Sequence, residues 1–459
     1  MTFNPDLQKP VNDTKALSVY KFPADWNLKP ARGLFRWRED LGGERDELLS
    51  LSSEYGVRKP VGLRGRAASL DLSKYRRVRP GDLVVNRLIA RDGALAVSLQ
   101  EGLVSPAYWV LETDPEILNS RYCHYLMRSK YSLDQISERS KYLPPAQFDI
   151  LWQDFRAITY PIPSIADQIA IGRYLDWANG QLDKAIRAKR KLIALLNEQK
   201  QAVIHRAVTR GINSSVRLKP SGIDWLGDIP THWDVVPSKS LFKHRREKAR
   251  DSDLTLTASQ THGIISRDTF MALEGRRVMQ VLTGLDILKH IEPNDFVMSM
   301  RSFEGGLEWS RIGGCVSSAY VALIPTEKVH FPYFAYALKC KSYIMDLRRT
   351  SDLVRDGQAL RYANFGKVAL PLIPITEQIV ISVYLDGEVA ELNDSISHLE
   401  REVGLLKEYR IRLVDDVVTG KLDVRKVAAR LPDEVLLGTV EDTADRSEDL
   451  DSADEEAAV

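Results

Sequence analysis

The sequence has few cysteines and no long hydrophobic run. Its three cysteines, Cys123, Cys315 and Cys340, are an odd number and form no Cys-x-x-Cys pair. This argues against a disulfide framework or a zinc ribbon and fits a reducing compartment. No window approaches the ~18 uncharged apolar residues that a membrane-spanning helix requires. No apolar run follows a basic start, so we expect no signal peptide, a cytoplasmic location and no membrane partner.

Motifs of catalysis and cofactor binding are also missing. The sequence has no GxxxxGK(S/T) phosphate loop, no GxGxxG after an expected strand, no HExxH and no HxE partnered with a CxxC. Leu143-Pro144-Pro145-Ala146 is not a methyltransferase phrase of the Asn-Pro-Pro-Tyr type. Asp82 lacks the Glu-x-Lys partner that metal nucleases use. We therefore expect no catalytic residue, no cofactor and no metal site in this chain.

The net charge conceals an uneven distribution of charge. The 64 basic and 63 acidic residues give +1. Residues 432–459 hold eleven of the acidic residues, one basic residue and no aromatic residue, so we expect an acidic disordered tail over 426–459. Without residues 432–459 the chain has 63 basic and 52 acidic residues, or +11. Such a charge permits a polyanionic partner but does not require one.

A long internal repeat is the main feature of the sequence. PSIADQIAIGRYLD at 163–176 returns as PITEQIVISVYLD at 374–386, and the copies keep one offset of 210 from Pro161/Pro371 to Asn213/Asp423. Upstream, FPADWNLKPARGLF (22–35) resembles IPTHWDVVPSKSLF (229–242), and RPGDLVV (79–85) resembles EPNDFVM (292–298). The order A–B–A′–B′ predicts a tandem duplication with a pseudo-two-fold axis, since solenoid repeats have periods of only about 20–50 residues.

Each B segment has the pattern of a long helix. Its apolar residues recur at steps of four and three, the period of a coiled-coil seam. Ser164 with Asp167 predicts a capping-box start, and Gly211 and Gly420 stand just past the ends. The predicted seam consists of Leu182, Ile186, Ile193, Leu196 and Val203 in the first copy and Leu392, Ile396, Leu399, Val403, Leu406 and Leu413 in the second.

Such a helix cannot bury its apolar stripe alone. A helix over about 165–208 would extend about 65 Å at ~1.5 Å per residue, and its economical partner is its own duplicate, laid antiparallel. Lys189, Lys200 and Arg410 interrupt the seams, where their stems can lie along apolar surface.

The A segments, near 14–160 and 215–370, mix short alternating strands, Gly/Pro turns and a few helices. We expect strands over 83–90 and 295–300 and helices over 121–129 and 333–341. The predicted fold is α+β, with two globular domains related by pseudo-two-fold symmetry and separated by an antiparallel coiled coil of two long helices. The expected boundaries are 1–160 for the first domain, 161–213 for the first helix, 214–370 for the second domain and 371–425 for the second helix.

Basic and polar residues gather in turn-rich parts of the A segments. For any one of them, an ordinary solvated surface is the better explanation. For the whole set, on duplicated domains, DNA contact is as good an explanation as a solvated surface, because Lys and Arg neutralise phosphates and Arg reads guanine. The candidates are Arg58, Lys59, Arg64, Arg66, Arg87, Arg91 and Lys141 in the first domain and Lys243, Arg245, Arg246, Thr261, His262, Arg267, Arg301 and Arg355 in the second.

Three phrases, in this order, resemble the specificity subunit of type I restriction–modification enzymes: IPSIADQIAIGRYLD (162–176), GIDWLGDIPTHWDVV (222–236) and EYRIRLVDDVVTGKLDVR (408–425). The resemblance spans about 19–425. It departs from the family at Asp167, which replaces the commoner Glu, and at Arg210-Gly211, which replaces the Gly-Lys present at Gly420-Lys421.

The resemblance implies two target-recognition domains, each reading one half of a split, asymmetric site in double-stranded DNA. It implies docking of two methyltransferase (M) subunits and of restriction/translocase (R) subunits. S-adenosylmethionine, ATP and Mg²⁺ would then belong to those partners. Three alternatives stay open: a subunit of a modification-only complex, a coiled-coil adaptor without DNA contact, and a stand-alone nuclease or methyltransferase.

Overall fold

The computed structural model describes residues 20–43, 47–53, 56–60, 72–143, 147–275, 287–299, 302–350, 352–354, 357–359 and 361–432. Four of the basic candidates, Arg64, Arg66, Arg301 and Arg355, lie outside the described residues, as does the acidic tail beyond residue 432.

Two long helices occur where the repeat predicts them. α4 (Ile165–Arg210) has 46 residues and α10 (Ile375–Val418) has 44. The chain divides into two compact units: unit 1 contains the described residues up to Lys189 and from Arg401 onward, and unit 2 contains Arg190–Glu400. Each unit therefore includes one α+β domain and one end of each long helix.

The domain of unit 1 is built on a four-stranded antiparallel sheet of order β2-β9-β6-β7. Its other strands pair as β1–β12, β3–β4, β5–β8 and β10–β11. The strands are β1 (Asn27–Pro30), β2 (Phe35–Trp37), β3 (Ser50–Ser52), β4 (Gly56–Arg58), β5 (Arg76–Val78), β6 (Leu83–Val85), β7 (Leu95–Val97), β8 (Gly102–Val104), β9 (Trp109–Thr113), β10 (Lys141–Leu143), β11 (Gln147–Asp149) and β12 (Thr159–Ile162). The short helices of unit 1 are α1 (Ser120–Arg128), α2 (Lys130–Arg139), α3 (Trp152–Phe155) and α11 (Arg425–Ala428).

The domain of unit 2 repeats this topology with a sheet of order β16-β23-β20-β21. Its other strands pair as β15–β26, β17–β18, β19–β22 and β24–β25, and β13–β14 is an additional hairpin. The strands are β13 (Leu218–Pro220), β14 (Asp228–Pro230), β15 (Asp234–Pro237), β16 (Phe242–Arg245), β17 (Leu256–Ser259), β18 (Gly263–Ser266), β19 (Lys289–Ile291), β20 (Phe296–Met298), β21 (Glu308–Trp309), β22 (Gly314–Val316), β23 (Val321–Pro325), β24 (Asp352–Val354), β25 (Gly357–Ala359) and β26 (Ala369–Leu372). The short helices of unit 2 are α5 (Arg267–Glu274), α6 (Ser302–Gly305), α7 (Phe331–Ala337), α8 (Lys341–Arg349) and α9 (Tyr362–Phe365).

Three of the predicted elements are shorter than expected, and the strand expected over 295–300 is found only over Phe296–Met298. The strand expected over 83–90 ends at Val85, and a 3-10 turn over Ala90–Asp92 follows and ends at Gly93, whose φ of 90° is left-handed. The helix expected over 333–341 ends at Ala337, because Cys340 is extended and starts the next helix. Hydrophobic patterning alone did not distinguish these breaks from continuous elements.

Each domain shares its core with the ends of both long helices. In unit 1, Ile171 and Leu175 of α4 and Val417 of α10 belong to one buried cluster with residues of the central sheet. In unit 2 the roles are exchanged, and the C-terminal residues of α4 join the N-terminal residues of α10. Fully burying one such side chain is worth about 1.5–3 kcal/mol, so each domain is packed onto its helix ends as a single core.

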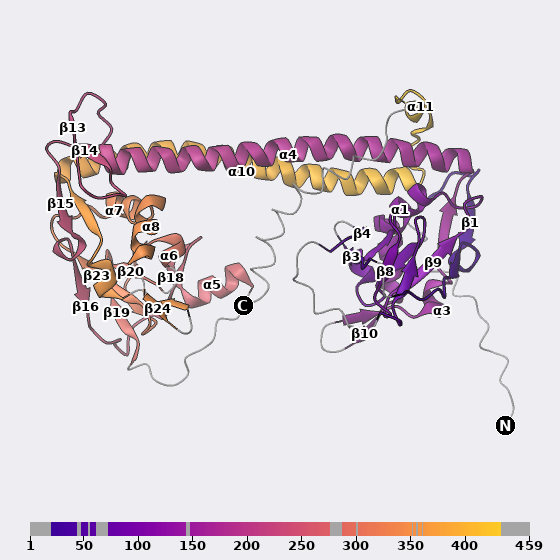
Figure 1. The fold of residues 1–459 in the computed structure, drawn as a ribbon, viewed down its shortest axis with the longest axis horizontal. Helices are drawn as coiled ribbons and strands as arrows, with labels where there is room; N and C mark the ends of the chain where they lie inside the picture. The colour runs from indigo at the N-terminus through magenta and orange to yellow at the C-terminus, as the bar shows by residue number, and fades with distance from the viewer. Residues whose placement is uncertain are drawn as a thin grey trace. The chain divides into compact units, whose positions relative to one another are not determined.

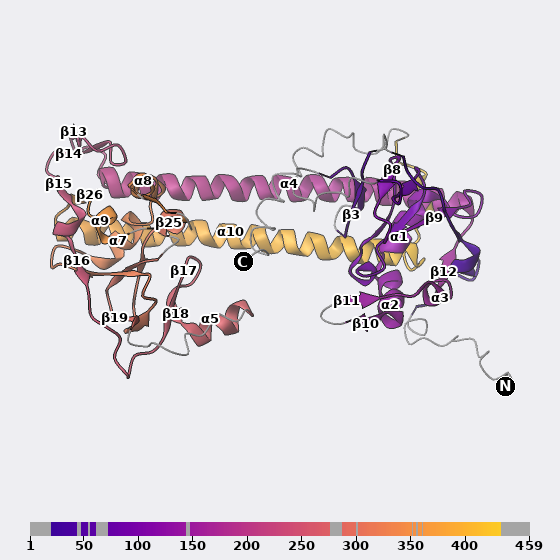
Figure 2. The ribbon, with the colours of Figure 1, turned by 60° about the horizontal axis from the view of Figure 1, so that its bottom comes forward.

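The two helices run antiparallel inside each unit (Figures 1 and 2). In unit 1, Arg410 donates to Asp183 and Lys189 lies 2.6 Å from Glu402, so α10 runs backward as α4 runs forward. In unit 2, Lys200 donates to Asn393 at 3.0 Å. The eleven predicted seam residues are buried or half-buried, and the predicted pairing is confirmed. The three cations that interrupt the seam each have a polar partner on the other helix, so they help to set the register.

The joints between domain and helix rest on a pair of buried glutamines. Gln168 Oε1 accepts from the amide of Asn119, and its Nε2 donates to the carbonyls of Ile117 and Pro163. In unit 2, Gln378 makes the same three bonds, to the amide of His330 and to the carbonyls of Lys328 and Ile373. Both side chains are fully buried, and all their partners are main-chain groups.

Candidate nucleic-acid interface

The first group of predicted basic residues follows the β3–β4 hairpin of unit 1. Arg58 closes β4 opposite Ser50 and is half-buried. Lys59 is exposed and lies 2.6 Å from Glu47. A solvent-exposed pair of this kind is weak, so the ammonium of Lys59 can exchange Glu47 for a phosphate at little cost.

A second group converges on the β10–β11 hairpin of unit 1. Arg91 places its guanidinium carbon 3.8 Å from the ring centroid of Phe148, and Arg87 Nε lies 3.5 Å from Asp149 Oδ1. Lys141 is exposed at the start of β10, opposite Asp149 in the register. The structure thus brings Lys141 close to Arg87 and Arg91, which lie about 50 residues earlier in the sequence.

Three basic candidates of unit 2 lie in or next to β16. Lys243 and Arg246 are exposed. Arg245 is different: its guanidinium donates to both carboxylate oxygens of Asp295, at 2.6 and 3.1 Å, and its side chain is only 11% exposed. A buried bidentate pair of this kind holds strands together and leaves little of the guanidinium for a phosphate.

The sequence contained a signal for this structural role. In unit 1 the same pair is made by Arg38 and Asp82, at 2.7 and 3.0 Å. The arginine is the last residue of LFRWR in the first copy and of LFKHR in the second. The aspartate lies inside RPGDLVV in the first copy and inside EPNDFVM in the second. A residue shared by both domains cannot distinguish one DNA half-site from another.

The remaining candidates of unit 2 lie on or beside the β17–β18 hairpin. Ser259 Oγ accepts from the amides of Thr261 and His262, which shapes the turn. His262 Nε2 lies 3.1 Å from Glu274 Oε1. Arg267 begins α5 with its side chain 20% exposed, 3.9 Å from Asp268. Thr261 and His262 are both exposed at the tip of the hairpin.

Sequence analysis missed a buried histidine beside this group. His290 is 4% exposed, with Nδ1 2.8 Å from Asp253 Oδ2 and Nε2 2.8 Å from Glu292 Oε1. Burial alone would lower the pKa of His290, but the hydrogen bonds to the two carboxylates outweigh burial and raise it. The imidazolium therefore ties together the segments before β17 and after β19. A lone histidine in the sequence gave no sign of these partners.

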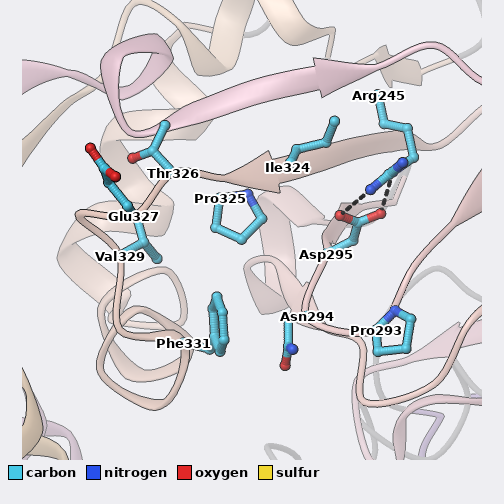
Figure 3. A pocket seen from close by; sticks show the side chains of 10 residues that line it. All are labelled: Arg245, Pro293, Asn294, Asp295, Ile324, Pro325, Thr326, Glu327, Val329 and Phe331. Atoms are coloured by element: carbon cyan, nitrogen blue, oxygen red, sulfur yellow. Dashed lines mark hydrogen bonds and ion pairs between the residues drawn. The ribbon is translucent and has the colours of Figure 1, made fainter.

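Unit 2 also has an open pocket of about 440 Å³ next to the Arg245–Asp295 pair (Figure 3). Pro325 and Phe331 form its apolar side, and Asn294 and Glu327 contribute polar groups. Two carboxylates, those of Asp295 and Glu327, line the pocket, and the only guanidinium that lines it is already paired. This composition disfavours a phosphate there.

The two helix ends differ in what covers them. In unit 1, Arg173 of α4 donates to the carbonyls of Leu431 and Pro432, at 2.6 and 2.8 Å, so the segment after α11 lies against α4. In unit 2 the matching surface of α10 is apolar and exposed, and we call it the apolar α10 face; it consists of Ile379, Val380, Val383 and Tyr384, which are 39–66% exposed. The two ends of the helix pair therefore differ in the polarity of the surface they expose.

Within the described ranges, no group of three or more His, Cys, Asp or Glu residues is arranged to hold a metal ion. No helix among the same residues is long and apolar enough to cross a membrane.

The fold is thus a duplicated α+β domain combined with two long helices that pair antiparallel. No protein-family model and no curated protein matches the chain. Solved structures do match. A chain from a structure described as the basis of complex assembly and conformational transition of the type I R-M system aligns with a TM-score of 0.62 and 15% identity, covering 88% of this chain and 100% of that chain. This likeness establishes that the two chains share their fold over nearly their whole lengths.

Two further chains match with lower scores. The HsdS subunit from Thermoanaerobacter tengcongensis aligns with a TM-score of 0.47 and 16% identity, covering 88% of this chain and 99% of that subunit. The type I restriction–modification S subunit from M. genitalium aligns with a TM-score of 0.32 and 14% identity, covering 85% of this chain and 96% of that one.

Proposed function

We propose that this chain is the DNA sequence-recognition subunit of a type I restriction–modification complex. The observation that carries the proposal is the whole-chain agreement with a chain of the type I R-M system, at a TM-score of 0.62 and full coverage of that chain. Each domain reads one half of a bipartite, asymmetric site in double-stranded DNA, and the paired helices set the distance between the halves.

Surface chemistry supports this division of labour. The two domains share topology and buried pairs such as Arg38–Asp82 and Arg245–Asp295, yet the sequences of their corresponding strands differ. Lys141 at the start of β10, for example, corresponds to Asp352 at the start of β24. Two domains that recognise different half-sites require a shared scaffold and different side chains at the DNA, because base contacts specify the sequence while the scaffold positions the domain on the duplex.

The proposed partners are two methyltransferase subunits and restriction/translocase subunits, all acting with this chain in the cytoplasm. The apolar α10 face supports protein docking on the helices. The chain itself is non-catalytic in this proposal, and S-adenosylmethionine, ATP and Mg²⁺ bind to the partner subunits. A complex that only modifies DNA would use this chain in the same way.

Methylation mapping tests the proposal directly. Genomic DNA from cells with and without the gene is compared, and we expect one bipartite adenine-methylated motif that depends on the gene. Replacing residues 14–160 with the first domain of another such subunit is expected to change one half of the motif only. A motif unaffected by the gene would overturn the proposal, and a chain that co-purifies with partners but binds no DNA in a gel shift would be an adaptor.

A further inference from the structure

The β10–β11 hairpin of unit 1 presents apolar side chains to solvent. All three residues of β10 are exposed, with Tyr142 58% and Leu143 45% exposed. In Figures 1 and 2 the hairpin lies at the edge of its domain remote from α4. On this two-stranded ribbon the exposed parts of Tyr142 and Leu143 are accessible to a ligand.

The aromatic side chains of this hairpin are held in a fixed arrangement. Tyr142 stands directly opposite Phe148, and their ring centroids lie 5.4 Å apart in an edge-to-face arrangement. The guanidinium of Arg91 covers the Phe148 ring at 3.8 Å. Such cation–π and aromatic contacts fix the rings before any ligand arrives.

The base of the hairpin is anchored and positively charged. The amide of Ile150 donates to the carbonyl of Arg87 at 3.4 Å, which ties the end of β11 to the loop after β6. Arg87 is 42% exposed and faces Asp149, and Lys141 stands beside them at the start of β10. The base therefore has three cations, Arg87, Lys141 and Arg91, and two acidic neighbours, Asp149 and Asp92. Its net charge is positive.

We propose that this hairpin is a wedge that inserts Tyr142 at a base step of duplex DNA, with Leu143 beside it on the other face of the ribbon, while Lys141 and Arg87 contact the flanking phosphates. The inference rests on the proposed function and names the side chains that act on the DNA. Two-stranded ribbons lie in the major or the minor groove of DNA. Inserted apolar side chains unstack a base step, and aromatic rings stack on the bases they expose.

The wedge belongs to the first domain only. The corresponding hairpin of unit 2 pairs Leu353 with Gln358 where unit 1 pairs Tyr142 with Phe148, and Asp352 replaces Lys141. The deformed base step therefore lies in the half-site that the first domain reads. Since pyrimidine–purine steps unstack most easily, the wedge selects sequence at that step by deformability.

The test uses the full chain in complex with its methyltransferase subunits and a duplex carrying the motif found by methylation mapping. 2-Aminopurine replaces one base at a time across both half-sites, and its fluorescence rises where stacking is lost. Apart from the target adenines, which the methyltransferase subunits flip out of the stack, we expect a several-fold rise at one step of one half-site. Tyr142→Ala with Leu143→Ala should abolish the rise and weaken specific binding about tenfold or more, with the salt dependence unchanged because no charge is removed. A Tyr142→Trp variant, which keeps an aromatic ring at this position, should still show the rise.

Leu28→Ala is the matched control, because Leu28 is also exposed, at 50%, but lies on β1. It should leave the rise and the affinity unchanged. A wild-type complex that binds the motif without any rise, or a double variant that keeps the full rise, would overturn the wedge and leave the proposed function intact. A complex without any motif-specific binding would instead overturn the proposed function.

Discussion

The phenolic hydroxyl of Tyr122 is shared between two main-chain carbonyls, that of Pro161 at 2.7 Å and that of Val418 at 3.3 Å, and the second bond spans 296 positions of the chain. Its counterpart in unit 2 is Tyr333, whose hydroxyl donates to the carbonyl of Val208 at 2.9 Å. Tyr122 in unit 1 thus bonds the last turn of α10, whose N-terminal end lies in unit 2. Tyr333 in unit 2 bonds the last turn of α4, whose N-terminal end lies in unit 1. Buried contacts of this kind fasten both ends of the helix pair to the domains.

Removing these hydroxyls should destabilise the protein. Tyr122→Phe and Tyr333→Phe each leave a buried carbonyl without its donor, which should cost about 1–3 kcal/mol. Denaturant unfolding should show a lower midpoint for each variant. Tyr409→Phe, at a tyrosine that is 54% exposed, should leave the midpoint unchanged. Midpoints equal to wild type would mean that water satisfies these carbonyls equally well.

The Lys189–Glu402 pair should behave as a register contact. Lys189→Glu places two carboxylates together between α4 and α10 and should lower stability by about 0.5–1 kcal/mol, since both side chains are partly exposed. Adding Glu402→Lys should recover most of the stability in a double-mutant cycle. Additive effects in the double variant would show that the two side chains do not interact.

Stability should depend on pH through His290. Its pKa is raised in the folded protein, so its contribution is complete below the unfolded pKa of about 6.5 and declines as pH rises through the folded pKa. His290→Gln should therefore cost more stability at pH ~6 than at pH ~9. His398→Gln, at an exposed site on α10, is the control. An equal cost at both pH values would contradict the charged pairing with Asp253 and Glu292.

The loop after β4 should contribute to the salt dependence of DNA binding. Charge reversal at Arg58, Arg64 and Arg66 leaves phosphates without their cations, so the slope of log affinity against log salt should flatten by about 0.9 for each phosphate that is no longer neutralised. Reversal at Lys21, Lys29 and Arg32, in the segment around β1, gives a variant of equal charge. A slope that both variants change equally would reflect net charge and remove the loop from the interface.

The helix pair should determine the spacer of the DNA site. Deleting one heptad from each helix at facing positions keeps the seam in phase and shortens each helix by about 10 Å at ~1.5 Å per residue. The spacer in the methylated motif should shorten by about three base pairs, at the ~3.4 Å rise of each base pair. A spacer of unchanged length would refute the role of the helices in setting it.

The repeat made much of this fold predictable. A constant offset of 210 identified both long helices, and the four-three spacing indicated a seam that must find a partner. The internal symmetry of the duplication predicted that this partner is the antiparallel duplicate. The partners of Lys189 and Arg410 were not predictable, since they depend on the axial register. The Tyr142–Phe148 pair depends on the pairing of two strands on either side of Pro144-Pro145-Ala146, a phrase that was considered only as a failed catalytic motif. Arg245 was placed in the interface because a basic cluster by itself does not reveal a buried partner.

The buried glutamines at the two joints have an evolutionary consequence. Gln168 and Gln378 each recognise only amide and carbonyl groups of the attached domain, and every amino acid except proline supplies both groups. The joints are therefore indifferent to the side chains that a domain carries. New recognition surfaces can arise by recombination or point mutation while each helix end still holds its domain through the same bonds.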